Sequence, residues 1–241
     1  MEKDKNLSAH RTRSFQAIIS DGYRLYTQNF GKLVRASWVQ AIIYALVTGF
    51  SMTYFFTSLL PKLAAHEGLM PELALWGGTF VVFLIAAIIF AFAGGIAPLH
   101  EHWQTDTISK PRRWWGRWPW KLTLRGLKVL PRMLWTTIRR GRLWTLIAVA
   151  LVMLLVVLVA TVIFQMPAII LATANIEGAA DIAAGDVPDL PENLWALNFF
   201  TFSVCGFLQA YIHLSTLFPF YYVWGNTQDK YKHGLDEKKN Q

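Results

Sequence analysis

The sequence predicts an all-α, polytopic membrane protein with four transmembrane helices and additional amphipathic helices at the membrane surface. Three observations predict this fold. Residues 144–174 contain no charge over about thirty positions, whereas about twenty apolar residues suffice to cross a bilayer's hydrocarbon core. Of the 241 residues, 54% are hydrophobic and only 16% are charged. Tryptophan residues stand at the ends of the apolar runs, as in the aromatic belts of membrane proteins.

The first predicted element is an amphipathic helix over residues 14–35. Its apolar residues share one helical face, a pattern typical of a helix that lies in the membrane interface. A helix that packs on the protein's own core is the alternative interpretation. The apolar face contains Phe15, Ile18, Ile19, Tyr26, Phe30, Leu33 and Val34, and the polar face contains Arg24, Gln28 and Lys32.

Two apolar runs follow, and we expect each to cross the membrane as a helix. The spans cover residues 38–60 and 76–97, with a short polar turn over residues 62–72. In hydrocarbon the backbone must pair its own hydrogen-bonding groups, which favours helices. Because small residues let helices approach closely in lipid, four glycines of the second span are expected to mark helix contacts. They are Gly77, Gly78, Gly94 and Gly95.

A strongly basic segment extends from Glu101 to Arg142. It carries eleven Lys and Arg residues, two acidic residues and the sequence WWGRWPW. Basic residues beside a span attract anionic phospholipid, and tryptophan anchors at the headgroup level. We therefore predict an amphipathic cytoplasmic segment that binds anionic lipid. Its predicted lipid-binding residues are Arg112, Arg113, Trp114, Trp115, Arg117, Trp118, Trp120, Lys121, Arg125, Lys128 and Arg132.

The third and fourth spans cover residues 144–174 and 195–224, and a charged tail follows. The loop between them, residues 175–194, carries five acidic residues and no basic residue. Of the 23 Lys and Arg residues, 22 lie on one side of this four-span arrangement, and Lys62 lies on the other. By the positive-inside rule, both termini and the basic segment are cytoplasmic, and the acidic loop is outside.

The two halves of the chain, residues 1–106 and 107–241, resemble each other. Each contains an amphipathic basic segment followed by a hairpin of two spans. Each hairpin begins at a tryptophan and leaves through a proline with a tryptophan five residues later (PLHEHW and PFYYVW). Both halves enter from the same side, which predicts parallel repeats about an axis along the membrane normal. Convergence on common features of membrane spans is the alternative explanation.

The stretch GYRLYTQNF, from Gly22 to Phe30, belongs to a surface helix that leads into a membrane hairpin. In this pattern the chain resembles poorly characterised bacterial integral-membrane families, such as the membrane domain fused to some glycerophosphodiester phosphodiesterases. The resemblance covers the first quarter of the chain. It implies a bacterial membrane module, which we expect in the cytoplasmic (inner) membrane, and it transfers no catalytic residue.

Few residues are candidates for catalysis or metal binding. His100, Glu101 and His102 carry groups that ligate zinc or iron. Helical residues two apart point in nearly opposite directions, so we predict no metal and no cofactor. Inside the fourth span, Gln209 and His213 lie one turn apart. An ionisable residue in a span suggests function by default, but we favour a neutral histidine that is hydrogen-bonded between helices.

Three classes of function remain. We favour a non-enzymatic membrane protein that binds anionic lipid and organises, supports or transports a lipid or membrane partner, as a homo-oligomer or with another membrane protein. A membrane-embedded metalloenzyme would use the His-Glu-His run. Nucleic acid is a weaker partner for the basic segment, because its tryptophans fit the headgroup region better. An oligomeric channel or transporter would need polar groups, and the spans offer Gln165, Asn198, Gln209 and His213.

The orientation can be tested with reporter fusions. A reporter that is active only outside the cytoplasm should work within residues 175–194. It should fail after Gln241 or beside Arg117, because the basic flanks keep those positions inside. Activity of the C-terminal fusion would contradict the four-span arrangement.

Overall fold

A computed structural model describes residues 13–65, 68, 70–105, 108, 135, 137–139, 141–187 and 191–239. Within these ranges the chain is 92% helical, without a strand. Four described stretches are long and apolar enough to cross a membrane: Phe15–Ala64, Met70–His102, Leu143–Phe164 and Leu194–Thr227. The predicted fold class is therefore confirmed.

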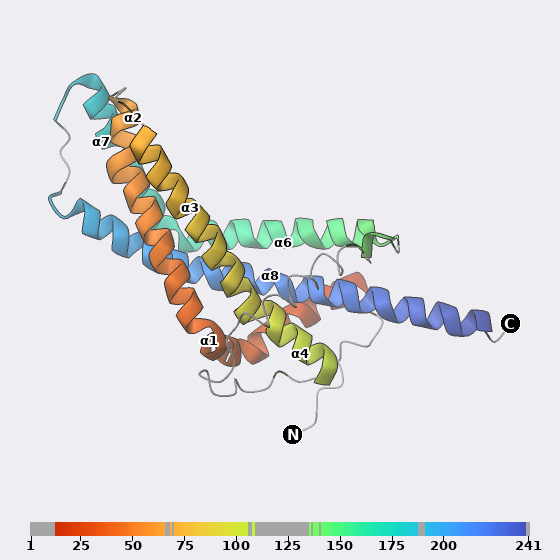
Figure 1. Cartoon of the computed structure of the whole chain (residues 1–241). Coiled ribbons are helices and arrows are strands. Elements are labelled where there is room, and N and C mark those ends of the chain that lie inside the picture. Colours follow the sequence, from red (N-terminus) through yellow and green to blue (C-terminus); the bar gives the residue numbers. More distant parts are fainter. Residues whose placement is uncertain are drawn as a thin grey trace. The chain divides into compact units, whose positions relative to one another are not determined.

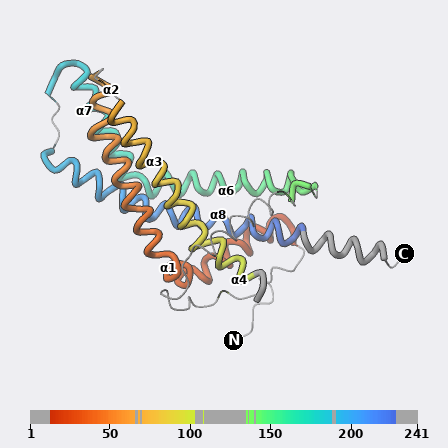
Figure 2. Tube along the Cα trace, in the orientation of Figure 1, coloured from red at the N-terminus to blue at the C-terminus, as the bar shows by residue number. Residues whose placement is uncertain are grey.

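The helices follow one another with few interruptions (Figures 1 and 2). Two of them contain a π-helical turn, so that the helix continues on both sides of it. The elements are α1 (Phe15–Tyr54), η2 (Phe55–Leu59), α2 (Leu60–Ala64), α3 (Met70–Ala91), η3 (Phe92–Ile96), α4 (Ala97–Thr105), α6 (Leu143–Phe164), α7 (Met166–Ala184) and α8 (Leu194–Lys239). The predicted surface helix and first span are thus one uninterrupted helix.

The chain divides into two compact units. Unit 1 comprises Met1–Trp38, Ala91–Leu158 and His213–Gln241, and unit 2 comprises Val39–Phe90 and Val159–Ile212. Four long helices, α1, α3, α6 and α8, each contribute residues to both units. Each unit therefore combines segments from the two halves of the sequence.

In unit 1, the first part of α1 packs part of its apolar face against the protein itself. Ile18, Leu25 and Leu33 are at most 2% exposed, whereas Phe15 and Phe30 are 42% and 41% exposed. Burial of the first three residues supports the alternative interpretation of this helix, in which it packs on the protein's own core. The two exposed phenylalanines remain available to a surrounding membrane.

Two of the four predicted glycine contacts are confirmed. A Cβ atom on Gly94 or Gly95 would lie 3.1 or 2.9 Å from the side chain of Leu214. The absence of a side chain therefore permits close approach to α8. The prediction is wrong for Gly77 and Gly78, where a Cβ atom would meet nothing within 4 Å, because no atom of a neighbouring helix approaches these two positions.

The third apolar run is not one helix. α6 ends at Phe164 and α7 begins at Met166, while Gln165 between them has φ −95° and ψ 1°. Pro167 lies in the first turn of α7, where a missing N–H removes no helical hydrogen bond. The prediction of one helix over residues 144–174 is therefore wrong at this point, because the proline starts a new helix.

The segment predicted as an acidic loop, residues 175–194, is helical over its first half. α7 continues to Ala184 and ends at Gly185, whose φ of 85° is left-handed. Glycine adopts this conformation without steric cost, so it terminates helices readily. The backbone N–H of Asp186 closes the turn by donating to the carbonyl of Asp181 at 2.9 Å.

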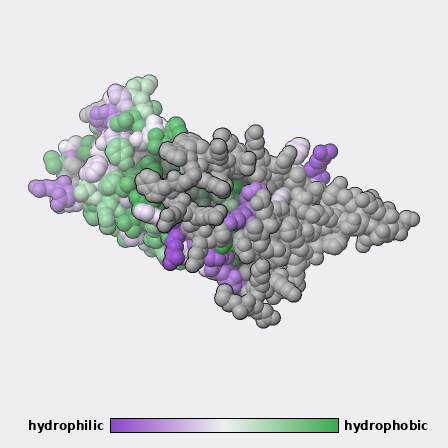
Figure 3. Space-filling view, turned by 60° about the horizontal axis from the view of Figure 1, so that its bottom comes forward, coloured by the Kyte–Doolittle hydropathy of each residue, from purple (hydrophilic) through white to green (hydrophobic). Residues whose placement is uncertain are grey.

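Apolar side chains cover much of the described surface (green in Figure 3). In α6, which is described completely, only Val149 and Met153 are buried, and Leu151, Leu154 and Leu155 are each more than 60% exposed. In water this exposure would cost about 25 cal/mol per Å² of apolar surface. In a bilayer the same surface meets hydrocarbon, which fits a membrane protein.

Gly22 lies against the backbone of Pro219 within unit 1, and this contact can be tested. A Cβ atom on Gly22 would lie 2.7 Å from the nitrogen and 2.8 Å from the Cα of Pro219. Gly22→Ala should lower stability by about 1–3 kcal/mol, since backbone atoms cannot move aside as a flexible side chain can.

The matched control is Gly31 on the same helix, where a Cβ atom meets nothing within 4 Å. Gly31→Ala should preserve or raise stability, because alanine is favoured over glycine inside helices. Thermal unfolding of both variants in one detergent provides the measurement. Equal unfolding temperatures would show that α1 does not approach Pro219 this closely.

Candidate functional site

The predicted lipid-binding residues lie outside the described residues, so their role stays a prediction. The structure likewise does not test their assignment to an amphipathic segment. They are Arg112, Arg113, Trp114, Trp115, Arg117, Trp118, Trp120, Lys121, Arg125, Lys128 and Arg132.

The His-Glu-His run lies in α4, and its two histidines have different environments. His102 is 3% exposed, and its Nδ1 lies 2.9 Å from the hydroxyl of Tyr221 in α8. His100 is exposed, and Glu101 is half-buried. Within the described part of the chain, no group of three His, Cys, Asp or Glu side chains is placed to hold a metal ion. His102 serves here to join α4 to α8.

Unit 1 also contains a buried cation. Arg13 is 7% exposed, and its Nε donates to the Asp21 carboxylate at 2.8 Å. Its guanidinium lies 4.1 Å from the centre of the Tyr222 ring. The Arg13 N–H donates to the side chain of Asn226 at 3.0 Å, and the Asn226 amide donates back to the Arg13 carbonyl at 3.2 Å. These bonds compensate the buried charge and fix residue 13 to α8.

The break between α6 and α7 in unit 2 is bridged by Cys205 of α8. In a continuous helix, the Ala168 N–H would donate to the Phe164 carbonyl. Here the Cys205 thiol donates to the Phe164 carbonyl instead, at 3.6 Å. The Gln165 side chain donates in turn to the Cys205 carbonyl at 3.2 Å. The Phe164 carbonyl and the Gln165 side chain, which lie at the break, are thereby both bonded to Cys205.

Three further pairs of side chains join α6–α7 to α8, and together with the Cys205 contacts they form what we call the polar seam. The Gln209 amide donates to the Thr161 hydroxyl at 2.7 Å, and the Gln165 amide donates to the Gln209 carbonyl oxygen at 3.4 Å. Asn175 and Asn198 exchange amide hydrogen bonds of 3.0 Å in both directions. Both asparagines are at most 3% exposed, so these bonds join the helices inside the unit.

The seam accounts for most of the polar residues predicted within the spans. Gln165, Asn198 and Gln209 each bond another side chain of unit 2, which gives the channel hypothesis no support. His213 belongs to unit 1 and is exposed. The hypothesis of a histidine hydrogen-bonded between helices stays a prediction.

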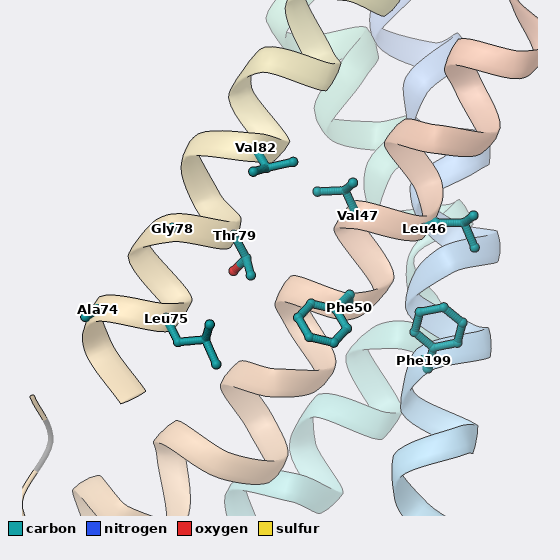
Figure 4. Close-up of a pocket in the computed structure, with 9 residues that line it drawn as sticks. All are labelled: Leu46, Val47, Phe50, Ala74, Leu75, Gly78, Thr79, Val82 and Phe199. Atoms are coloured by element: carbon teal, nitrogen blue, oxygen red, sulfur yellow. The ribbon is translucent and has the colours of Figure 1, made fainter. Parts of the chain in front are cut away.

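An apolar groove opens between α1 and α3 in unit 2 (Figure 4). Its volume of about 640 Å³ falls within the range of ligand pockets, about 300–1,000 Å³. Thr79 is the one lining residue with a polar side chain, and its hydroxyl donates to the Trp76 carbonyl at 2.7 Å. The groove is lined by Leu46, Val47, Phe50, Ala74, Leu75, Gly78, Thr79, Val82 and Phe199.

Sequence reasoning missed Asn175, Cys205 and the groove. Asn175 was assigned to a loop, and a lone cysteine in an apolar run carries no pattern that predicts its partner. One usable signal was present, because a proline two residues after a polar residue, here Pro167 after Gln165, is typical of a helix start. The groove has no sequence signature, since it depends on which faces of α1 and α3 are packed.

Comparison with protein-family models, with curated proteins and with solved structures finds no match for this chain. The resemblance of Gly22–Phe30 to bacterial membrane families therefore stays a prediction, and functional conclusions depend on the chain's own residues.

The asparagine pair can be tested by a double-mutant cycle. Asn175→Leu should lower the free energy of unfolding by about 1–3 kcal/mol, because it leaves the amide of Asn198 buried without this partner. Asn198→Leu should act likewise. The double variant should be less destabilised than the sum of the singles, since it removes both polar groups. Thermal unfolding in detergent measures all four proteins, and additive effects would contradict the pairing.

Proposed function

We propose that this protein is a non-enzymatic integral membrane protein that binds anionic lipid through its basic segments. In this role it organises, supports or transports a lipid or membrane partner. The observation that carries the proposal is the division of charge between the two units. Counted along the sequence, unit 1 contains 22 basic and eight acidic residues, a formal charge of +14. Unit 2 contains one basic and seven acidic residues, a formal charge of −6.

The chemistry of unit 1 suits an anionic membrane surface. Each Lys or Arg near such a surface contributes about 1 kcal/mol, and the attraction extends over a Debye length of about 10 Å. The four tryptophans of residues 114–120 add anchorage at the headgroup level. Because the basic segments adjoin helices that are long and apolar enough to cross a membrane, the basic residues would lie beside the bilayer.

We further propose that both termini and the basic segment, residues 101–142, face the cytoplasm in a bacterial inner membrane. The same charge division supports this orientation, since basic flanks are retained on the cytoplasmic side. The anionic phospholipids of that leaflet, phosphatidylglycerol and cardiolipin, are then the expected ligands of the basic segments.

Lipid recognition can be measured on the full-length protein. Protein extracted from membranes of phosphatidylethanolamine and phosphatidylglycerol should carry the anionic lipid at a higher fraction than the bulk membrane. Mass spectrometry of the co-purified lipid gives this enrichment. Replacing Arg112, Arg113 and Arg117 with glutamine should remove most of it, because about 1 kcal/mol is lost per charge.

A matched control removes the same charge elsewhere, by replacing Lys230, Lys238 and Lys239 of the tail with glutamine. This control should retain most of the enrichment. If both triple variants lose it equally, net charge rather than the tryptophan-rich segment attracts the lipid. If the unaltered protein shows no enrichment, the proposed function fails.

A further inference from the structure

We propose that the groove between α1 and α3 binds one acyl chain of a bilayer phospholipid. This site lies in unit 2 and uses none of the basic residues of unit 1, so it is independent of the proposed headgroup recognition. We infer the ligand from two properties of the groove: the apolar chemistry of its walls and its position along the predicted spans.

Aromatic side chains hold α1 and α3 together along one edge, and the groove opens along the other. On the first edge, the ring centres of Tyr44 and Phe83 lie 5.2 Å apart, and those of Phe55 and Trp76 lie 5.6 Å apart. On the open edge, α3 presents Gly78, where a Cβ atom would meet nothing within 4 Å. Aromatic packing thus fixes the distance between the helices, and the glycine leaves the space between them unfilled.

The walls of the groove are suited to hydrocarbon. Figure 4 shows Val47 of α1 and Val82 of α3 directed toward the space between the helices. The hydroxyl of Thr79 is already bonded to the Trp76 carbonyl and lies 3.3 Å from Ser51 Oγ. A peptide, sugar or headgroup would lose its hydrogen bonds to water there without replacing them. An acyl chain forms no hydrogen bonds with water, so it loses none on entering the groove.

The position of the groove along α3 indicates how a bound acyl chain would be oriented in the bilayer. The α3 wall runs from Ala74 to Val82, about 12 Å at 1.5 Å per residue. It begins near the start of the second predicted span and extends toward the middle of the bilayer. The ion pair of Lys62 with Glu72 precedes this wall by two residues of α3. Lys62 is the one basic residue in the sequence of unit 2, and its charge is already paired with Glu72, so the apolar walls rather than a cation select the occupant.

The test uses the full-length protein in bilayer discs with a phosphatidylethanolamine that carries a photoreactive group on its acyl chain. Cross-linked residues are identified by mass spectrometry, and the expected sites are Leu75, Val82 and Phe199. Gly78→Leu should reduce labelling of these residues by about tenfold, because the new side chain occupies the apolar volume that the acyl chain would fill.

Gly77→Leu is the matched control, since a Cβ atom there also meets nothing within 4 Å but Gly77 does not line the groove. It should leave the labelling unchanged. Leu75→Gln provides a second variant of similar size, and it should also reduce labelling because it makes the wall polar. A protein with Arg112, Arg113 and Arg117 replaced by glutamine should label normally, which separates this site from the proposed function.

Equal labelling in Gly78→Leu and Gly77→Leu, together with normal labelling of Leu75→Gln, would overturn the proposal. A cysteine placed at Gly78 in a Cys205→Ser background tests the competing occupant, a second copy of the chain. Efficient disulfide formation between two chains at that position would also overturn the proposal, because the groove would then be covered by protein.

Discussion

The packing of unit 2 depends on one constraint, that polar groups inside a membrane span must find their partners within the protein. The break at Gln165 would leave the Phe164 carbonyl without its helical partner. The Cys205 thiol donates to this carbonyl, while the Cys205 carbonyl accepts from the Gln165 side chain. A kink is tolerated when a side chain inserts into the helical ladder in this way, and the insertion ties α8 to the point where α6 gives way to α7.

The other polar contacts of the seam follow from that position of α8. Once α8 lies beside the break, Gln209 meets Thr161, and Asn198 meets Asn175. Interhelical bonds of this kind contribute about 0.6–2 kcal/mol each in membranes. The α3 helix takes no part in the seam, and its partly unpacked edge leaves the apolar groove. Unit 2 thus contains a hydrogen-bonded interface between α6–α7 and α8 and a partly open interface between α1 and α3.

In unit 1, three contacts join earlier parts of the chain to the last helix, α8. Arg13 is bonded to Asn226, His102 lies against Tyr221, and Gly22 approaches Pro219. Segments from the beginning and middle of the chain are therefore fixed to the last helix. The sequence of this unit also carries most of the basic residues. Their attraction to an anionic membrane surface is the physical basis of the proposed lipid recognition.

The sequence alone determined the helical fold, the four apolar stretches and the division of charge, because hydropathy, helix period and charge are properties of neighbouring residues. It also identified the contacts at Gly94 and Gly95, but it could not distinguish them from Gly77 and Gly78. Only the tertiary structure decided which glycines are packed, how the break at Gln165 is paired and where the groove opens. These features depend on which distant segments meet, and no local pattern encodes that choice.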